Sequence, residues 1–450
     1  MNDKQFHHFP IGLPASGKST FAQQLAEIEG SRHEIVSTDK IREQLFGDEI
    51  VQGDWRQVEA EVMSRVKEAI ASGKYIIYDA TNAKRPWRMD WLEKIAAATG
   101  KEFASVCWYL STPVETCKKW NKSRQRQVPE IAIEKMSSSI AQFPPDVAEG
   151  FVAVHQINPA QEKAIGEVIR EKIKSIPRSI TNRKSRTAKY TLHRYSRLRD
   201  FERLMHLIAL TIEYPGIGNL QTTAPEIIEN IFRTVPKFTT AIEEITAIVS
   251  KRRGQIYANP QELAIDLEWL ERNGIIGTRE VDAEIKEESD RASGSNYPCH
   301  RYSDREPFGR LMKTIRYIAH HPFKHRKQEE FIKELVRNKV LPVEEQDNFR
   351  RDVQEALKPY RIISDFPMKR GYFVGTGIFT KWELEKLYGL IQSQKMHLQD
   401  PVVVEMLQKF RERIEASKLL EVEAAYPIRV IGNRGIVNPE NLPESALSKH

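Results

Sequence analysis

The stretch GLPASGKST at residues 12–20 constrains the fold of this chain more than any other segment. Four residues separate its two glycines, and Lys-Ser follows the second glycine directly. An apolar run precedes the stretch, and the residues after it place Phe21, Ala22, Leu25 and Ala26 on one face of a helix. A strand, a glycine-rich loop and a helix in this order form the context of a phosphate-binding loop. The sequence therefore predicts a nucleotide site near the start of an α/β domain.

Each element of this loop has a mechanical role in holding phosphate. Gly12 and Gly17 permit unusual backbone angles, so that consecutive N–H groups face the phosphates, and Lys18 reaches the β and γ oxygens. Ser19 is a predicted ligand of Mg²⁺. The alternative is a chance match in a loop rich in glycine and serine, but the flanking strand and helix favour ATP. The predicted ATP-binding residues of the loop are Gly12, Pro14, Ala15, Ser16, Gly17, Lys18, Ser19 and Thr20.

Hydrophobic periodicity divides the chain into two kinds of structure. Short apolar runs alternate with helical patterns over residues 1–160, which indicates a parallel sheet with helices on both faces. From Leu198 onward, amphipathic helical periodicity replaces this alternation. Between the two parts, residues 172–199 hold ten Lys or Arg and no Asp or Glu. We therefore predict an α/β P-loop domain with a parallel sheet, a basic linker and a mostly helical region.

The helical region repeats itself weakly, which indicates tandem modules. RLMHLIALTIEYP at 203–215 aligns without a gap with RLMKTIRYIAHHP at 310–322. Each copy is followed by further helical patterns, in the outline of a winged helix. The predicted boundaries are 1–171 for the P-loop kinase-like domain, 172–199 for the basic linker, 200–282 for the first winged-helix-like module, 283–306 for a polar linker, 307–376 for the second module and 377–450 for a helical connector and tail.

A carboxylate and an arginine follow the second predicted strand, at the sheet edge where open α/β sheets bind ligands. Asp39 comes after HEIVST, and Arg42 lies one helical turn further on. A carboxylate at this place can accept the proton of an attacking hydroxyl, and an arginine can hold a phosphate of the acceptor. The alternative is a helix-capping aspartate beside a surface arginine. The spacing from the phosphate-binding loop favours catalytic roles.

Two later segments add candidates for the same site. The run YIIYD ends at Asp79, as in a Walker B element, so this carboxylate is a candidate ligand of Mg²⁺, directly or through water. A helix cap is the alternative for Asp79. NKSRQR at 121–126 lies between two helical segments, where a lid could carry Arg124 onto the donor phosphates. A solvated basic loop is the alternative for Arg124.

GLPASGKST, STDKIR, IIYDATN and WNKSRQRQVP occur in this order, and together they resemble the 5′-hydroxyl polynucleotide kinase family of P-loop AAA-type kinases. The resemblance covers about the first 160 residues. It implies that Lys18 and Ser19 bind ATP and Mg²⁺, that Asp39 is the general base for the 5′-hydroxyl, that Arg42 contacts a phosphate of the acceptor strand, and that Arg124 acts on the donor phosphates. Trp120 departs from this family, which often has arginine before the asparagine of this motif.

A second candidate site lies in the second helical copy. Its predicted helix turns Phe349, Val353, Ala356 and Leu357 inward. The candidate nucleic-acid-binding residues are Arg350, Arg351 and Gln354 on the opposite face, with Lys369 and Arg370 on a wing before GYFVG. The alternative is a solvated face beside a neighbouring domain.

The same half resembles the tandem winged-helix region of WYL-domain transcription regulators. The resemblance lies in RRDVQEALKPYRIISDFPMKRGYFVG and in GIFTKWELEKLYGLIQ, and it implies DNA binding. The WYL domain that normally follows these modules is absent from the sequence given.

Composition limits the compartment and the kind of partner. The formal net charge of +7 favours an anionic partner such as nucleic acid. No apolar run is long enough to span a membrane and no export leader is visible, so we expect no membrane association and a cytoplasmic location. The cysteines, Cys107, Cys117 and Cys299, are too few and too scattered for a disulfide framework.

Three functions are compatible with these features. The first is an ATP- and Mg²⁺-dependent kinase of nucleic-acid 5′-hydroxyl ends, fused to a nucleic-acid-binding region. The second is a DNA-binding regulator that senses nucleotide without phosphorylating nucleic acid. The third is a small-molecule kinase whose helical half is a scaffold. The sequence leaves open whether DNA or RNA is the acceptor, and it leaves the oligomeric state open.

Overall fold

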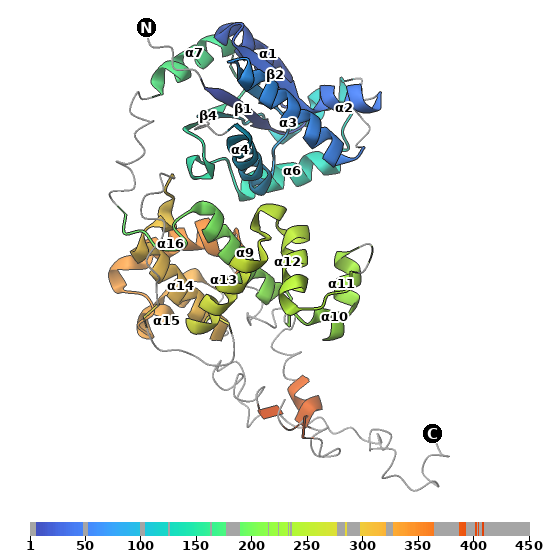
Figure 1. The fold of residues 1–450 in the computed structure, drawn as a ribbon. Helices are drawn as coiled ribbons and strands as arrows, with labels where there is room; N and C mark the ends of the chain where they lie inside the picture. Colours follow the sequence, from blue (N-terminus) through green and yellow to red (C-terminus); the bar gives the residue numbers. More distant parts are fainter. Residues whose placement is uncertain are drawn as a thin grey trace. The chain divides into compact units, whose positions relative to one another are not determined.

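The computed structural model describes most of the chain up to residue 363 and a few residues beyond it. The described residues are 6–47, 53–99, 104–124, 127–162, 164–176, 190–214, 216–223, 225–232, 234, 236–276, 284–285, 298–320, 327–363, 387–392, 401–402, 404 and 407–408. They fall into two compact units (Figure 1). Unit 1 comprises Met1–Leu204, Thr246–Asn259 and Glu288–Arg305, and unit 2 comprises Met205–Ile245, Pro260–Glu287 and Glu306–His450.

Unit 1 is built on a five-stranded parallel sheet. Its strands are β1 (His7–Gly12), β2 (His33–Ser37), β3 (Tyr75–Asp79), β4 (Ser105–Leu110) and β5 (Ala153–Ile157), in the order β2-β3-β1-β4-β5. All four strand pairs are parallel, and β1 lies at the centre. The predicted parallel sheet is thereby confirmed. Since parallel strands present their carboxyl ends at one edge, the segments after β1, β2, β3 and β4 gather there.

Helices connect these strands. They are α1 (Lys18–Glu29), α2 (Thr38–Phe46), α3 (Trp55–Ala71), α4 (Arg85–Thr99), α5 (Val114–Lys122), α6 (Glu130–Gln142) and α7 (Ile165–Ser175), with a short 3₁₀ turn, η1 (Val147–Glu149). The buried residues of α3 are Val58, Val62, Val66 and Ala69, a spacing of three and four residues that places them on one helix face.

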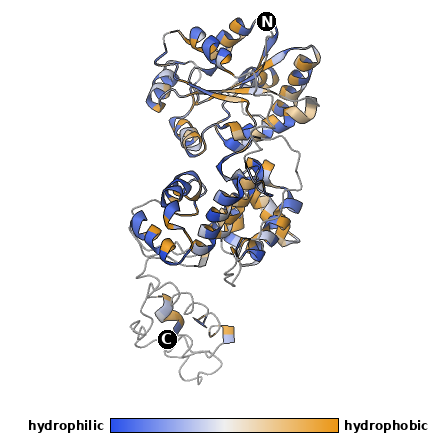
Figure 2. Ribbon diagram, turned by 90° about the vertical axis from the view of Figure 1, so that its left-hand side faces the viewer, coloured by the Kyte–Doolittle hydropathy of each residue, from blue (hydrophilic) through white to orange (hydrophobic). Residues whose placement is uncertain are grey.

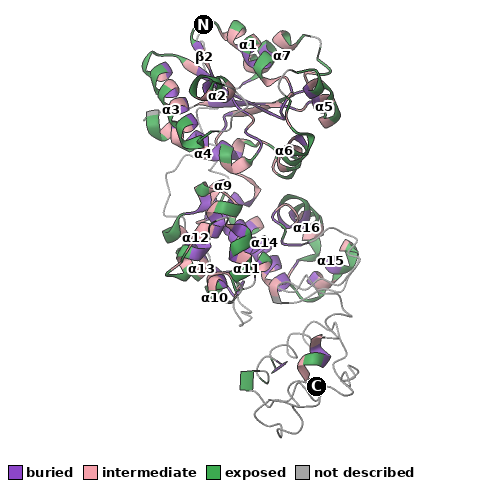
Figure 3. Ribbon diagram, turned by 90° about the vertical axis from the view of Figure 1, so that its right-hand side faces the viewer, coloured by how far each residue is buried: buried purple, intermediate pink, exposed green. Residues whose placement is uncertain are grey.

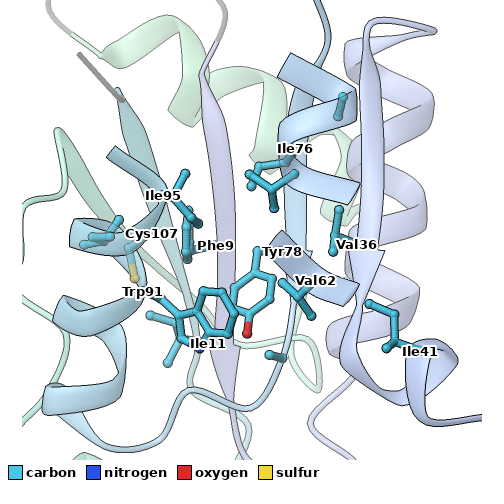
Figure 4. Packing of buried hydrophobic residues seen from close by; sticks show 14 of the residues in the cluster. Phe9, Ile11, Val36, Ile41, Val62, Ile76, Tyr78, Trp91, Ile95 and Cys107 are labelled. Atoms are coloured by element: carbon cyan, nitrogen blue, oxygen red, sulfur yellow. The ribbon is translucent and has the colours of Figure 1, made fainter. Parts of the chain in front are cut away.

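Two apolar clusters cover the two faces of the sheet. On one face, Phe9, Val36 and Tyr78 of the strands pack with Val62 of α3 and with residues of α4 (Figure 4). On the other face, residues of α1 and α7 pack against the alternate strand positions. Figures 2 and 3 show the sheet as an apolar, buried layer, with exposed polar residues on the outer faces of the helices. Burial of both faces explains why the strands read as short continuous apolar runs.

Pro10 lies inside the central strand, where proline is unusual because it has no N–H for the ladder. Strand β1 pairs with β4 at all six positions from His7 to Gly12, including Pro10 opposite Trp108. Its ladder with β3 has one residue pair, His8 opposite Ile77. The central strand thus tolerates the proline at the expense of a short ladder with β3.

Unit 1 extends beyond the sheet and its helices through a buried ion network. Arg88 donates from Nε and Nη2 to the carboxylate of Glu149 at 2.6 and 2.7 Å. Arg85 donates to Glu149 at 3.0 Å and to Glu202 at 2.9 Å, and the hydroxyl of Tyr257 also donates to Glu202. Glu202 lies in α9 (Leu198–Glu213) and Tyr257 in the 3₁₀ turn η3 (Gln255–Tyr257). Buried charges are stable only when paired, so this network ties these two segments to the α/β core.

Unit 2 is helical throughout its described part. Besides the later turns of α9, its elements are α10 (Leu220–Thr223), α11 (Pro225–Ile231), α12 (Ala241–Arg252, whose second half belongs to unit 1), α13 (Pro260–Arg272), α14 (Arg305–His320), α15 (Gln328–Arg337), the 3₁₀ turn η5 (Val343–Glu345), α16 (Gln346–Asp352) and a π-helical turn, η6 (Val353–Leu357). A further 3₁₀ turn, η4 (Arg301–Ser303), belongs to unit 1. No described helix in either unit is long and apolar enough to cross a membrane.

The two repeated segments form matching helices. The first lies in α9 and the second in α14, and both helices are 16 residues long. The mostly helical character of the second half is therefore confirmed. The proposed wing, with Lys369, Arg370 and GYFVG, lies outside the described residues.

Two histidines, buried His8 and half-buried His155, lie beside Trp108 of β4. The Nε1–H of Trp108 donates to Nδ1 of His8 at 3.0 Å, and the His155 ring centroid lies 5.1 Å from that of Trp108. Burial, and then the neighbouring His33, lowers the pKa of His7 to about 3. Burial likewise lowers the pKa of His155 to about 4 and that of His8 well below its usual value. These imidazoles are therefore neutral in the folded state at neutral pH.

We expect the free energy of unfolding to decrease as the pH falls from about 6.5 towards 4. An unfolded histidine takes up a proton near pH 6.5, whereas the buried ones stay neutral to lower pH, so the unfolded state binds more protons in this window. Each such histidine contributes at most about 1.4 kcal/mol per pH unit, and half-buried His155 contributes less. Urea unfolding followed by tryptophan fluorescence should give a lower midpoint at acidic than at neutral pH. His155→Gln should weaken this dependence, and equal midpoints for the parent protein would contradict it.

Candidate active site

The loop between β1 and α1 has the backbone that a phosphate cradle requires. A Cβ atom at Gly12 would lie 2.6 Å from Ser16 Oγ and 3.1 Å from the carbonyl oxygen of Leu110, so glycine is needed there. Gly17, at the N-cap of α1, has a left-handed φ of 94°, and Ala15 has a φ of 58°. Left-handed residues in a short loop turn successive N–H groups to one side, as in anion-binding nests. The loop therefore fits the phosphates of a nucleotide.

Opposite charges are concentrated beside this loop. Lys18 Nζ donates to the carbonyl oxygen of Leu13 at 2.7 Å. Burial lowers the pKa of Lys18, the carboxylates of Asp79 and Asp39 oppose this shift, and the cation of Arg124 adds to it. Burial raises the pKa of Asp79, against the opposing effect of Lys18. Charges on four separate segments thus act on one another at this sheet edge.

Ser19 and Asp79 fit a magnesium ion. Ser19 Oγ donates to Asp79 Oδ2 at 2.9 Å, so the two oxygens already lie together at the start of α1 and the end of β3. Hydroxyl and carboxylate oxygens are ligands that Mg²⁺ prefers, and phosphate oxygens and water usually complete its shell. Asp79 is the metal candidate that the sequence indicated together with Ser19.

Helix α2 contributes an acidic and a basic residue to the site. Asp39 is the second residue of this helix, and Arg42 Nη1 donates to its Oδ1 at 3.0 Å. The Asp39 side chain is 44% exposed and the Arg42 side chain 13%. A carboxylate that is solvent-accessible and oriented by an arginine can receive a proton from an incoming hydroxyl.

One cavity of about 1020 Å³ brings the sequence-predicted residues together. Gly12 and Ser16 are buried in the loop itself. The predicted residues that line the cavity are Pro14, Ala15, Gly17, Lys18, Ser19, Thr20, Asp39, Arg42, Asp79 and Arg124. The volume lies at the upper end of the range for ligand pockets.

Several residues of the site were not predicted from the sequence. The hydroxyl of Thr112 donates to the carbonyl oxygen of Ser16 at 2.9 Å and thereby supports the phosphate-binding loop. Asn121 bridges the base of the Arg124 segment, because its side chain donates to the Val128 carbonyl at 2.8 Å and accepts from the Val128 N–H at 2.9 Å. Thr112 follows an apolar strand at the edge that holds Asp79, and that position was the available signal.

Arg88 supports the wall of the cavity next to β3. Its Nη1 donates to the carbonyl oxygens of Asn82 and Ala83 at 3.3 and 3.0 Å. Asn82 lines the cavity with a left-handed φ of 45°. The buried guanidinium thus holds a strained segment of backbone in place.

A histidine cluster elsewhere in unit 1 does not fit a metal ion. Among the described residues, His8, Glu29 and His33 bring potential ligand atoms within 4.8 Å of one another. The indole N–H of Trp108 donates to His8 Nδ1, so in the neutral ring the proton is on Nε2. The Nε2 atom then has no lone pair for a metal, and none of these three residues lines the cavity.

The candidate nucleic-acid-binding residues of the second half lie in unit 2. Phe349, Val353, Ala356 and Leu357 are buried, as the predicted helix face requires. The residues on the opposite face, Arg350, Arg351 and Gln354, are exposed. The structure therefore leaves this face accessible.

Replacement of Gly12 by alanine should weaken ATP binding. The added Cβ would overlap Ser16 Oγ and press on the Leu110 carbonyl, and overpacking of this kind costs about 1–3 kcal/mol. We expect about a tenfold to hundredfold higher dissociation constant for ATP·Mg²⁺ in calorimetric titration. Gly166→Ala in α7 is the matched control, because a Cβ there meets only ordinary contacts from 3.6 Å outward. Unchanged affinity in Gly12→Ala would contradict the cradle.

Comparison with known proteins found a family model that matches the first part of the chain. Residues 8–143 match a family model described as an AAA domain. The match spans the phosphate-binding loop and β1 to β4, together with α1 to α6. No match was found among curated proteins.

Three solved structures with local similarity to this chain are distant from it in sequence. One is a chain in the structure of the Pnkp1/Rnl/Hen1 RNA repair complex, with 22% identity over 31% of this chain and 46% of that chain, at a TM-score of 0.26. Another is a gluconokinase from Sinorhizobium meliloti, with 17% identity over 40% of this chain and 97% of that chain, at a TM-score of 0.28. A third is a deoxyadenosine kinase from M. mycoides with bound dCTP, with 16% identity over 38% and 100% of the two chains, at a TM-score of 0.27. Over residues 8–143, which include the phosphate-binding loop, the chain is thus similar to AAA domains.

Proposed function

We propose that unit 1 transfers the γ-phosphoryl group of ATP to the 5′-hydroxyl end of a nucleic acid. The observation that carries this proposal is the shared cavity, which Asp39 and Arg42 line together with Lys18, Ser19 and Asp79. A protein that only senses nucleotide needs no carboxylate–arginine pair beside the phosphate cradle. The order of the four motifs, which resembles polynucleotide kinases, favours a 5′-hydroxyl end as the acceptor.

The chain's own residues can perform an in-line transfer. The hydroxyl oxygen forms a bond to the γ-phosphorus while the bond from that phosphorus to the bridging oxygen breaks, and ADP leaves. Asp39 takes the hydroxyl proton, and Arg42 orients Asp39 through their hydrogen bond. Lys18 and Arg124 stabilise charge on the phosphoryl oxygens. A magnesium ion held by Ser19 and Asp79 would neutralise charge on the β and γ phosphates when bound.

Asp39→Asn should abolish transfer while leaving ATP binding nearly intact. The amide keeps the shape of the side chain but cannot take up the proton, and loss of a general base lowers kcat by about 10²- to 10⁴-fold. The measurement is transfer of label from ATP to a 5′-hydroxyl oligonucleotide, with ATP affinity measured separately. Glu43→Gln is the matched control, since Glu43 is an exposed acidic residue of the same helix outside the cavity lining. Parent-level transfer by Asp39→Asn would contradict its role.

The same assay separates the proposed function from its two alternatives. Labelled 5′ ends of DNA or RNA support the proposal and identify the acceptor. Labelled small molecules without labelled ends would indicate a small-molecule kinase. Nucleotide-dependent binding of duplex DNA without any labelled product would indicate a nucleotide-sensing regulator.

We further propose that unit 2 binds nucleic acid through the exposed face of α16 and η6. Arg350, Arg351 and Gln354 lie on this face, opposite the buried residues of the same turns. Arginine contacts with phosphates supply most of the affinity in such interfaces, and a winged-helix-like module would place this helix in the major groove.

The double variant Arg350→Ala/Arg351→Ala should bind nucleic acid more weakly and with less dependence on salt. Each lost phosphate contact lowers the slope of log affinity against log salt by about one. Fluorescence anisotropy over a salt series measures this slope. Lys327→Ala/Lys333→Ala is the matched control, because both lysines are exposed in or next to α15 in the same unit and the same charge is removed. Equal slopes for the two double variants would contradict binding through α16.

A further inference from the structure

Aromatic side chains line part of the cavity that contains Asp39, and the sequence motifs account for only one of those named below. They include Trp55, Tyr78, Trp87 and Trp91, of which Tyr78 belongs to IIYDATN. Tyr78 and Trp91 are buried and contribute to the core, whereas Trp55 is 43% exposed. An exposed tryptophan that lines a cavity adds little to the core and offers a flat apolar surface to a ligand.

We propose that Trp55 stacks on the base of the acceptor's terminal nucleotide, so that the substrate at Asp39 is a nucleoside end. This inference rests on the proposed phosphotransfer at the same site, and it assigns a binding surface for the part of the acceptor that does not react. The proposal defines the substrate by its planar base as well as by the hydroxyl group that reacts.

Trp55 is separated from the proposed general base by one side chain. The guanidinium carbon of Arg42 lies 5.6 Å from the centroid of the Trp55 ring, and Arg42 donates to Asp39 at 3.0 Å. A nucleoside whose 5′-hydroxyl lies at Asp39 therefore has its base within reach of this tryptophan. A cation beside an aromatic ring also suits a nucleotide, because the base can stack while the adjacent phosphate meets the arginine.

The position of the Trp55 ring is supported by the fold. Trp55 is the first residue of α3, and the preceding Asp54 caps the helix by accepting a hydrogen bond from the Arg56 N–H at 2.9 Å. The ring packs edge-on against Trp91, with centroids 6.5 Å apart and planes at 85°. A capped helix start and an aromatic neighbour restrict the ring before any ligand arrives, which lowers the entropic cost of stacking.

Three residues of the cavity carry polar atoms without partners. Arg42 Nε, Tyr78 Oη and Asn82 Nδ2 are buried, and they have no hydrogen-bonding partner among the described residues. All three side chains line the cavity. Buried donors are normally paired with protein, water or a ligand. A terminal nucleotide offers acceptor atoms in its phosphate, sugar and base, and its base is a planar group that suits Trp55.

The test combines changes in the protein with a change in the acceptor. We expect Trp55→Ala to raise KM for a 5′-hydroxyl oligonucleotide about tenfold to hundredfold, as loss of one base–aromatic stack predicts, while KM for ATP stays unchanged. Trp55→Phe should restore most of the loss. An oligonucleotide whose terminal nucleotide lacks its base should show a similarly raised KM with the parent protein, and Trp55→Ala should then add no further effect. Leu45→Ala is the control, because Leu45 is 41% exposed on α2 and lies outside the cavity lining.

The outcomes separate this inference from the proposed function. If the parent protein phosphorylates 5′-hydroxyl ends, but neither removal of the base nor Trp55→Ala changes KM, the stacking role is overturned and the kinase assignment stands. If the parent protein phosphorylates only small molecules without a base, both are overturned. The acceptor without a base leaves the protein unaltered, so it decides the question even if Trp55→Ala fails to fold.

Discussion

Parallel pairing within the sheet of unit 1 is the constraint on which the candidate site depends. Because β1 to β4 all run in the same direction, the residues that follow each of them emerge at one edge. The phosphate-binding loop follows β1, Asp39 follows β2, Asp79 ends β3 and Thr112 follows β4. The loop, Asp39 and Asp79 therefore line one cavity although they are far apart in the sequence, and Thr112 supports the loop beside it.

The charges brought together at this edge suit an anionic ligand together with a metal ion. Lys18 loses solvation, and the Asp79 and Asp39 carboxylates compensate for it. Asp79 is itself buried enough that its pKa rises despite Lys18 and Ser19. Phosphate brings negative charge to Lys18 and Arg124, and a divalent cation brings positive charge to Asp79. Phosphate and a divalent cation together would compensate both the cations and the carboxylate. Phosphate alone would leave Asp79 less well compensated, and the cation alone would leave Lys18 and Arg124 so.

Much of unit 1 was accessible from the sequence, because its signals are local. The apolar runs predicted the strands. The glycines, Lys18 and Ser19 predicted the phosphate-binding loop, because adjacent residues form such a loop. Asp39 and Asp79 were site candidates because Asp39 comes shortly after a predicted strand and Asp79 ends one. The position of Trp55 at the cavity was not predicted, because Trp55 lies at the start of a helix that has no fixed spacing from the phosphate-binding loop.

The second half shows the opposite situation. The buried face of α16 and η6 was predicted from periodicity, and Phe349, Val353, Ala356 and Leu357 are indeed buried. A winged-helix fold could not be established in this way, because it depends on how helices pack and on a wing that lies outside the described residues. The contacts of Arg350 and Arg351 depend on a partner, which periodicity does not describe.

The ion network of unit 1 connects the cavity with residues far along the chain. Arg88 holds the backbone of Asn82 at the cavity wall, and Glu149 holds Arg88 and Arg85. Arg85 in turn reaches Glu202 of α9. Since removal of one partner of a buried ion pair is destabilising, the pair of Arg85 and Glu202 couples α9 to the start of α4. The cavity wall at Asn82 is thus linked to residues beyond 171, the predicted end of the P-loop kinase-like domain, as well as to the motifs within it.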